Sequence, residues 1–191
     1  NGTDLWVTGD GSTTTGGIRY TTLGANTSSI LTNATGAALT NVRAVSIFDG
    51  QLYASSNSAS GTNNFRGVLS VGTGLPTTDM QPASLLFPPV AIRSSYDFWF
   101  KDASTLYVAD DGSAANGGGI QKWTESGGAW TLSYILLNDG ATRTPVRGLS
   151  GAIVGSEAVL YATTTQTSAN NLITVTDSSA AAAATTLATA P

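Results

Sequence analysis

The chain repeats one short pattern, a leucine followed by an aromatic and a small residue, at a nearly constant interval. The pattern starts at Leu5, Leu52, Leu106 and Leu160. The spacings are 47, 54 and 54 residues. A second marker, an aliphatic residue followed by arginine, recurs in the same phase at Val42, Ile92 and Val146. A period near 50 residues points to a repeat architecture, in which each repeat is one supersecondary unit that stacks on its neighbours.

The third repeat shows most clearly what such a unit contains. Four short runs follow one another, each rich in aromatic or β-branched residues and bounded by Gly, Asn, Asp or Ser. They are Tyr96–Phe100, Leu106–Ala109, Gly119–Thr124 and Ala129–Leu136. A four-stranded meander of this length is the unit of a β-propeller blade. The sequence therefore predicts an all-β chain that forms a β-propeller of about four blades, at residues 1–40, 41–90, 91–141 and 142–191.

The other repeats contain imperfect copies of this unit. A tight Asp49-Gly50 turn joins two strands of the second repeat, since Asp-Gly between apolar runs is a strong hairpin signal. The run Ala180–Ala184 is too short to hold a helix alone, so we expect a loop there. The remaining predicted strands are Asp4–Thr8, Gly17–Thr22, Ser29–Thr32, Val42–Phe48, Gln51–Ser55, Arg66–Val71, Ala83–Phe87, Val146–Val154, Val159–Thr163, Leu172–Thr176 and Thr185–Ala188.

The first repeat begins without an opening strand. We therefore expect the chain to be a fragment of a longer one, part of a six- to eight-bladed ring. A closed ring of four blades with one deficient blade is the alternative. Unpaired sheet edges invite association with other strands, so the rest of the propeller or a second copy is an expected partner.

Composition excludes several classes of function. Only 10% of the 191 residues are charged, and the formal net charge is −4. The eight basic residues are spread along the chain, whereas a nucleic-acid binder needs a concentrated basic face. No apolar run approaches the roughly 20 residues of a membrane span. Histidine and cysteine are absent, which removes thiolate chemistry, the usual zinc ligands and the Ser-His-Asp triad.

Several segments of the chain carry a family likeness: NVRAVSIFDGQLYASS, SYDFWFKDASTLYVADDG, GGGIQKWTESGGAWTLSYIL, PVRGLSGAIVGSEAVLYATT and the final TTLATAP. They resemble a group of exported bacterial repeat proteins that are predicted β-propellers and often carry sorting signals or other extracellular modules. The likeness covers essentially the whole chain, and LYVADD with GGGIQKW is its most distinctive part. It implies a propeller fold and a secreted or cell-surface location, and it implies no reaction.

Three arginines take the same place in successive repeats: Arg43, Arg93 and Arg147. If the first strand of each blade lines a central channel, these residues form a ring of guanidinium groups. Such a ring suits a carboxylate, sulfate or phosphate, because arginine offers a planar fork of donors. The alternative is that each arginine pairs with an aspartate or a carbonyl of the adjacent repeat and holds the repeats together.

Aspartates after the second strand are the candidate metal ligands. Asp110 and Asp111 precede Gly112 in the third repeat, and Asp10 precedes Gly11 in the first. Clustered carboxylates with small residues can hold Ca²⁺. The full alternating pattern of a calcium loop and its distal glutamate are missing, and Asp with Gly also forms ordinary turns. We expect no other cofactor.

The remaining candidates give weaker signals. The two glutamates, Glu125 and Glu157, lie beside predicted turns and do not stand out as an acid–base pair. The glycines of Gly117–Gly119 match neither a P-loop nor a dinucleotide fingerprint. The aromatic residues are expected to fill the interfaces between repeats rather than stack on sugar rings. They are Trp6, Trp99, Trp123, Trp130, Tyr53, Tyr107 and Tyr161.

Three functions remain open. The first is an exported, non-catalytic binding or scaffold module with an anionic or carbohydrate ligand. The second is an extracellular hydrolase or lyase that acts on an anionic polymer or ester, with the arginines holding the substrate and Asp110 or Asp111 within a few ångströms of them. The third is a structural repeat that assembles edge to edge. The missing histidine and the low charge favour the first.

Overall fold

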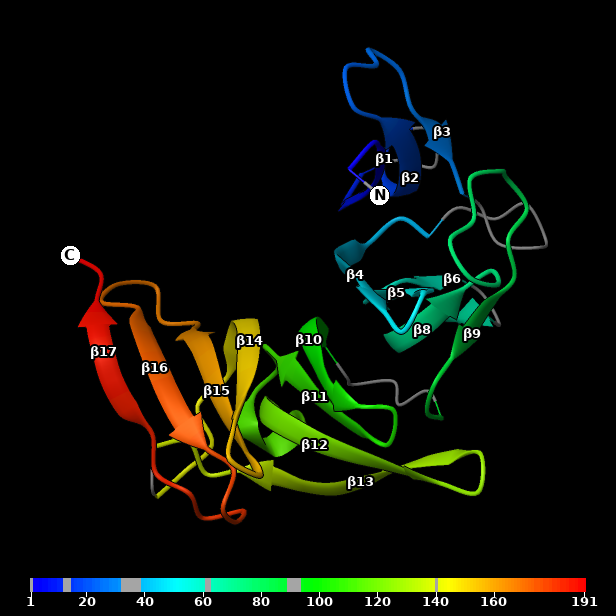
Figure 1. Ribbon diagram of the computed structural model, residues 1–191. Coiled ribbons are helices and arrows are strands. Elements are labelled where there is room, and N and C mark those ends of the chain that lie inside the picture. The colour runs from blue at the N-terminus through cyan, green and yellow to red at the C-terminus, as the bar shows by residue number, and fades with distance from the viewer. Residues whose placement is uncertain (1, 12–14, 32–38, 61–62, 89–93, 140) are drawn as a thin grey trace. The chain divides into compact units, whose positions relative to one another are not determined.

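Figure 1 shows a computed structural model of the chain, which describes residues 2–11, 15–31, 39–60, 63–88, 94–139 and 141–191. The chain divides into two compact units, Asn1–Ala91 and Ile92–Pro191. This division falls at the predicted border between the second and third repeats, so each unit contains two repeats. None of the described residues belongs to a helix long and apolar enough to cross a bilayer.

The protein is all-β, as predicted, and its described sheets are antiparallel meanders. In the first unit, three strands form the first sheet in the order β1-β2-β3: Asp4–Gly9, Gly17–Thr22 and Ser29–Ile30. Four strands form the second sheet in the order β4-β5-β8-β9: Val42–Phe48, Gln51–Ser56, Gly67–Val71 and Ala83–Leu85. Two short strands that the sequence did not indicate, β6 (Ala59–Ser60) and β7 (Asn63–Asn64), pair within the predicted loop.

The second unit contains two four-stranded sheets (Figure 1). The third sheet consists of β10–β13: Ser95–Asp102, Thr105–Asp110, Gly119–Ser126 and Ala129–Leu136. A 3₁₀ turn, η1, spans Ala114–Asn116. The fourth sheet consists of β14–β17: Val146–Val154, Glu157–Thr164, Asn171–Thr176 and Thr185–Thr189. The predicted strands are thus confirmed within a few residues, and Ala180–Ala184 is a turn and loop.

Within each unit, consecutive sheets pack through their first strands. In the second unit, β14 packs on β10 and on β11. The Leu149 N–H of β14 donates to Asp97 Oδ2 of β10 at 2.9 Å, which joins the two sheets by a direct hydrogen bond. In the first unit, β4 packs on β1. In both units, therefore, the first strand of the later sheet packs on the earlier sheet.

Each unit has its own buried core. The core of the second unit includes Tyr107, Leu136, Val146 and Leu160. The core of the first includes Ile18, Val42, Leu52 and Leu69. Leu52 and Leu160 are repeat-marker leucines, and both are fully buried. In the second, third and fourth repeats the marker leucine thus fills the interior, whereas Leu5 of the first repeat is 40% exposed.

Candidate functional site

The predicted arginine and aspartate of the second unit meet at the start of β14. Arg147 Nε lies 3.1 Å from Asp111 Oδ2, and the Arg147 guanidinium lies 5.4 Å from the centre of the Tyr96 ring. Asp111 Oδ1 also accepts a hydrogen bond from Ser94 Oγ at 2.5 Å. The Arg147 side chain is 54% exposed. The contact thus joins successive repeats, and it leaves about half of the Arg147 side chain exposed to solvent.

Asp110, beside it, is fully buried. Its Oδ1 accepts the Gly112 N–H at 2.9 Å, and its Oδ2 accepts the Ser94 N–H at 2.9 Å and Gln121 Nε2–H at 3.2 Å. The Asp110 carboxylate thus holds the turn after β11 in place through these three hydrogen bonds. In the described part of the chain, no three His, Cys, Asp or Glu residues are grouped so that they could hold a metal ion. Calcium binding at Asp110, Asp111 or Asp10 stays a prediction.

The first unit has a related arrangement around Asn41. Arg43 Nε donates to Asn41 Oδ1 at 3.2 Å. Asp10 forms a β-bridge with Asn41, and its Oδ1 accepts the Gly11 N–H at 3.0 Å. Asp10 follows Leu5 at the same distance along the chain as Asp111 follows Leu106. Arg93 lies outside the described residues, so the ring of three arginines stays a prediction.

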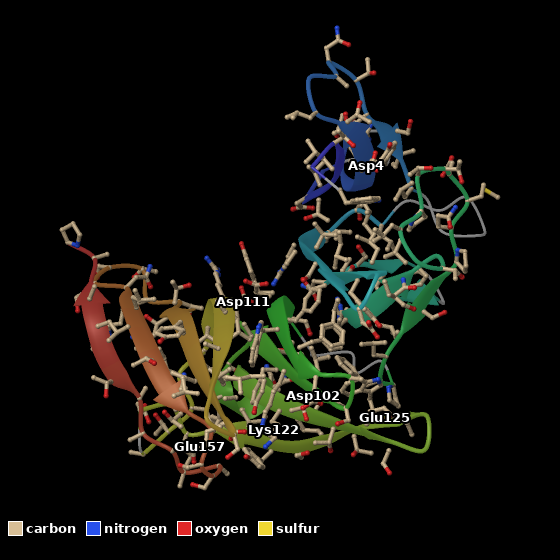
Figure 2. All side chains as sticks on the ribbon, viewed as in Figure 1. Asp4, Asp102, Asp111, Lys122, Glu125 and Glu157 are labelled. Carbon is tan, nitrogen blue, oxygen red and sulfur yellow. The ribbon has the colours of Figure 1, made fainter. Side chains whose placement is uncertain are left out.

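A second polar group in the second unit was not foreseen. Tyr107, Lys122 and Tyr134 lie side by side across β11, β12 and β13. Asp177, which follows β16 of the next sheet, accepts from all three: Lys122 Nζ at 2.7 Å, Tyr134 Oη at 2.6 Å, and Tyr107 Oη. We call these four residues the Asp177 cluster. Figure 2 labels Lys122 on this sheet, away from Asp111.

The electrostatics of the Asp177 cluster favour a charged pair. Burial of Asp177 opposes its ionisation, but the hydrogen bonds from Lys122, Tyr107 and Tyr134 outweigh it and lower its pKa. Burial likewise opposes the charge on Lys122, but the bonds to Asp177 and Tyr134 raise its pKa. The pKa of Tyr107 is raised by burial and by Asp177. None of the three groups is thereby prepared for proton transfer near neutral pH.

The sequence predicted that two members of this cluster are neighbours, but not their acidic partner. The predicted hairpins place Tyr107 beside Lys122, and Lys122 is one of only two lysines in the chain. The acidic partner comes from the turn after β16, 55 residues beyond Lys122 in the chain. The packing of one sheet on the next brings it there, and strand patterns do not encode that packing.

A polar hollow of about 350 Å³ lies in the second unit, between the β13–β14 connection and the β15–β16 end of the fourth sheet. Amide, hydroxyl and carboxylate groups dominate its lining: Asn138, Asp139, Thr144, Thr164, Gln166, Asn171 and Thr186, with the apolar Ile173 and Ala184. Asn138 is buried and exchanges two hydrogen bonds with the Thr144 backbone, at 2.9 and 2.7 Å. The wall of the hollow is therefore held in place by its own hydrogen bonds.

Asp139 at the rim of this hollow is held ionised. Its carboxylate accepts from the Thr142 hydroxyl and N–H and from the Ala141 N–H. The Thr142 hydroxyl is the largest cause of a pKa lowered to about 2, because the bond favours the charged form.

We expect an NMR pH titration to show the Asp139 carboxyl titrating near pH 2. Because this folded-state pKa is below the unfolded value, its stabilising effect is present above the unfolded pKa and is lost as the pH falls through about 2. Thr142→Val should move the titration toward the ordinary aspartate range. Thr131→Val, on β13, is the control and should leave it unchanged. An Asp139 titration midpoint that is the same in Thr142→Val as in the native protein would contradict this account.

The remaining predicted residues have structural positions. Glu125 Oε1 accepts the Gly128 N–H at 2.6 Å in the β12–β13 turn, and Glu157 is an exposed residue at the start of β15. Tyr107 and Trp123 are buried, as expected for the aromatic residues. Tyr161 is 40% exposed, so its prediction as interface filling was wrong for the described chain. The reason is that its face of the fourth sheet has no further sheet of the second unit packed on it.

Comparisons with protein-family models, curated protein sequences and solved structures find no match to this chain.

Proposed function

We propose that the chain forms blades of a β-propeller and serves as a non-catalytic binding module outside the cell. The propeller is supported by the order of the strands, since each full sheet is a four-stranded meander. The packing of consecutive sheets through their first strands supports it as well. The exposed apolar residues on the outer face of the fourth sheet, Val154, Tyr161 and Leu172, suit a further blade packed there. Location outside the cell follows from the resemblance.

The polar hollow is the observation that carries the binding function. Its volume of about 350 Å³ is within the range of small-ligand sites. A wall of amides and hydroxyls, with the Asp139 carboxylate at its rim, offers both donors and acceptors, as a polyhydroxylated ligand requires. A carbohydrate is therefore the ligand class that this site suits best. The Arg147 guanidinium is a separate candidate for a carboxylate or sulfate group.

Adjacent asparagines give a matched test of the hollow. Asn171 lines it, whereas the exposed Asn170 does not. We expect a panel of neutral and acidic oligosaccharides, screened by NMR and calorimetry, to contain a ligand. Asn171→Ala should weaken its affinity about tenfold, the size expected when one hydrogen-bonding group is removed. Asn170→Ala should leave it unchanged. Equal affinities of the two variants would place the ligand elsewhere, and an absence of binding across the panel would argue against a carbohydrate module.

The hydrolase or lyase remains a second candidate because Arg147 and Asp111 are in contact, as that function requires. Asp111 is already bonded to Ser94 and Arg147, which is an arrangement that also serves to hold repeats together. Turnover of an acidic polysaccharide such as polygalacturonate, abolished by Asp111→Asn and kept by Asp79→Asn, would establish the enzyme in place of the binding module.

A further inference from the structure

Two of the amide side chains that line the polar hollow are held by their oxygen atoms. Asn171 Oδ1 accepts from the Thr189 hydroxyl at 2.7 Å, and Gln166 Oε1 accepts from the Thr164 hydroxyl. Within the described residues, neither NH₂ group donates to another protein group. Because an amide nitrogen carries two N–H donors, both side chains come to the hollow with their donors available for a ligand.

A single buried hydroxyl positions both amides. Thr164, at the end of β15, is only 5% exposed. Its hydroxyl donates to Gln166 Oε1 and accepts the Asn171 N–H at 2.9 Å. The two NH₂ groups are therefore held in a fixed relation to one another before a ligand enters, which lowers the entropic cost of binding.

An apolar patch lies beside these donors. Ile173 and Ala184 are the two apolar residues of the lining. Ile173 follows Asn171 by two positions on β16, and strand alternation places both side chains on the same face of the sheet. The Ile173 side chain belongs to the buried core of the second unit, so its position is fixed by packing. The hollow thus presents an N–H donor and an apolar surface next to each other.

The charge of the hollow decides what kind of acceptor the donors suit. Amide N–H groups can bind a carboxylate or a neutral carbonyl. The described residues that line the hollow include the Asp139 carboxylate and no lysine or arginine. Arg143, four residues further along the chain, donates to the Ala114 carbonyl instead. Repulsion from Asp139 therefore favours a neutral carbonyl over a second carboxylate.

We propose that the polar hollow binds the acetamido group of an N-acetylated amino sugar. The acetamido carbonyl accepts from Asn171 Nδ2, with Gln166 Nε2 as the second donor. The acetamido methyl packs on Ile173 and Ala184, and the ring hydroxyls of the sugar face threonine hydroxyls such as that of Thr186. A sugar with a plain hydroxyl in place of the acetamido group would leave the apolar patch uncovered. This inference rests on the proposed carbohydrate function and names the sugar.

Matched sugars test the acetamido group. The probes are the methyl glycosides of N-acetylglucosamine and N-acetylgalactosamine, and each is compared with its parent glucoside or galactoside, which carries a hydroxyl at the same carbon. We expect at least one acetamido sugar to bind the full chain at least tenfold more tightly than its parent, by NMR titration. One added hydrogen bond and one buried methyl group give an effect of this size. Saturation-transfer NMR should show the strongest contact at the acetamido methyl.

Isosteric variants test the donors. Asn171→Asp and Gln166→Glu keep the oxygen that accepts from a threonine hydroxyl and lose the NH₂ group. Each should lower the preference for the acetamido sugar over its parent at least threefold. Asn170→Asp is the control, because it adds the same charge at the exposed neighbour and should keep the preference. Circular dichroism of the variants checks that they are folded.

Three outcomes would overturn the inference while sugars still bind. The parent sugars could bind as tightly as the acetamido sugars, or the methyl glycoside of glucuronic acid could bind more tightly than both. The preference could also survive in Asn171→Asp and in Gln166→Glu, which would place the acetamido group elsewhere. In the first two cases the proposed carbohydrate function stands and only the choice of sugar is wrong. If no sugar binds, the proposed function fails and this inference fails with it.

Discussion

Replacing Lys122 by methionine is expected to destabilise the second unit by about 3 kcal/mol at pH 7. The substitution keeps an unbranched apolar stem and removes the ammonium, so Asp177 keeps its charge with its side chain only 2% exposed. Breaking a buried ion pair by removing one partner typically costs about 3–5 kcal/mol. We take the lower end because Tyr107 and Tyr134 still donate to the carboxylate.

The pH dependence identifies the cause. In the native protein the pKa of Asp177 is lowered. The stabilisation from the cluster is therefore fully present above the pKa of aspartate in the unfolded chain, and it is lost as the pH falls through the pKa of Asp177 in the folded protein. In Lys122→Met the lowering by the ammonium is lost, so we expect the pKa of Asp177 to be higher than in the native protein. The deficit should therefore be largest near neutral pH and shrink on acidification, as Asp177 becomes neutral.

Urea unfolding followed by tryptophan fluorescence measures this effect, since three of the four tryptophans lie in the second unit. Lys101→Met is the matched control, because the other lysine of the chain makes an exposed contact with the Ser156 carbonyl. Adding Asp177→Asn to Lys122→Met should restore at least half of the lost stability. A deficit that is the same at every pH would show that lost packing, rather than an unpaired charge, is responsible.

Replacing Gly151 by alanine is expected to cost about 2 kcal/mol. The new Cβ would meet three ring carbons of Trp99 at 2.4, 2.5 and 2.7 Å, closer than carbon atoms can approach. Overpacking of this kind typically costs about 1–3 kcal/mol, because the ring or the strand must move. Trp99 would lose its stacking on Tyr107, so the fluorescence of the folded state should change as well.

A double-mutant cycle with Trp99→Leu isolates that contact. Leucine leaves room for the added methyl, so Gly151→Ala should cost much less in the Trp99→Leu background. Ala152→Val is the control, because residue 152 is the exposed neighbour on the same strand and valine favours strands. If the cost of Gly151→Ala is the same with tryptophan and with leucine, the contact is not its cause.

The sequence carried most of the information about the strands and little about how the sheets meet. The marker leucines and the alternating runs predicted the four meanders because strand pairing within a repeat is local. The Asp177 cluster and the polar hollow each combine residues from consecutive sheets or their connections. Their side chains look like ordinary turn residues in the sequence, since Asp, Asn and Thr are common in loops.

The sequence predicted the pairing of Arg147 with an aspartate of the adjacent repeat as one of two alternatives, the other being a ring of arginines. The repeat phase identified the arginine, and the turn after β11 identified the aspartate. What the phase could not show is that Ser94, just before β10, and Tyr96 of β10 complete the contact. The exposure of Tyr161 was mispredicted for a related reason, because a repeat position says where a side chain points and not whether a neighbour covers it.

The Asp177 cluster also affects how cooperatively the chain unfolds. An array of repeats melts as one body only when the coupling between neighbours is strong compared with the stability of each repeat. Between the third and fourth sheets, part of that coupling is a single carboxylate shared by three strands of one sheet. When acid neutralises it, the fourth sheet becomes the more independent unit, and the transition should broaden or separate into steps.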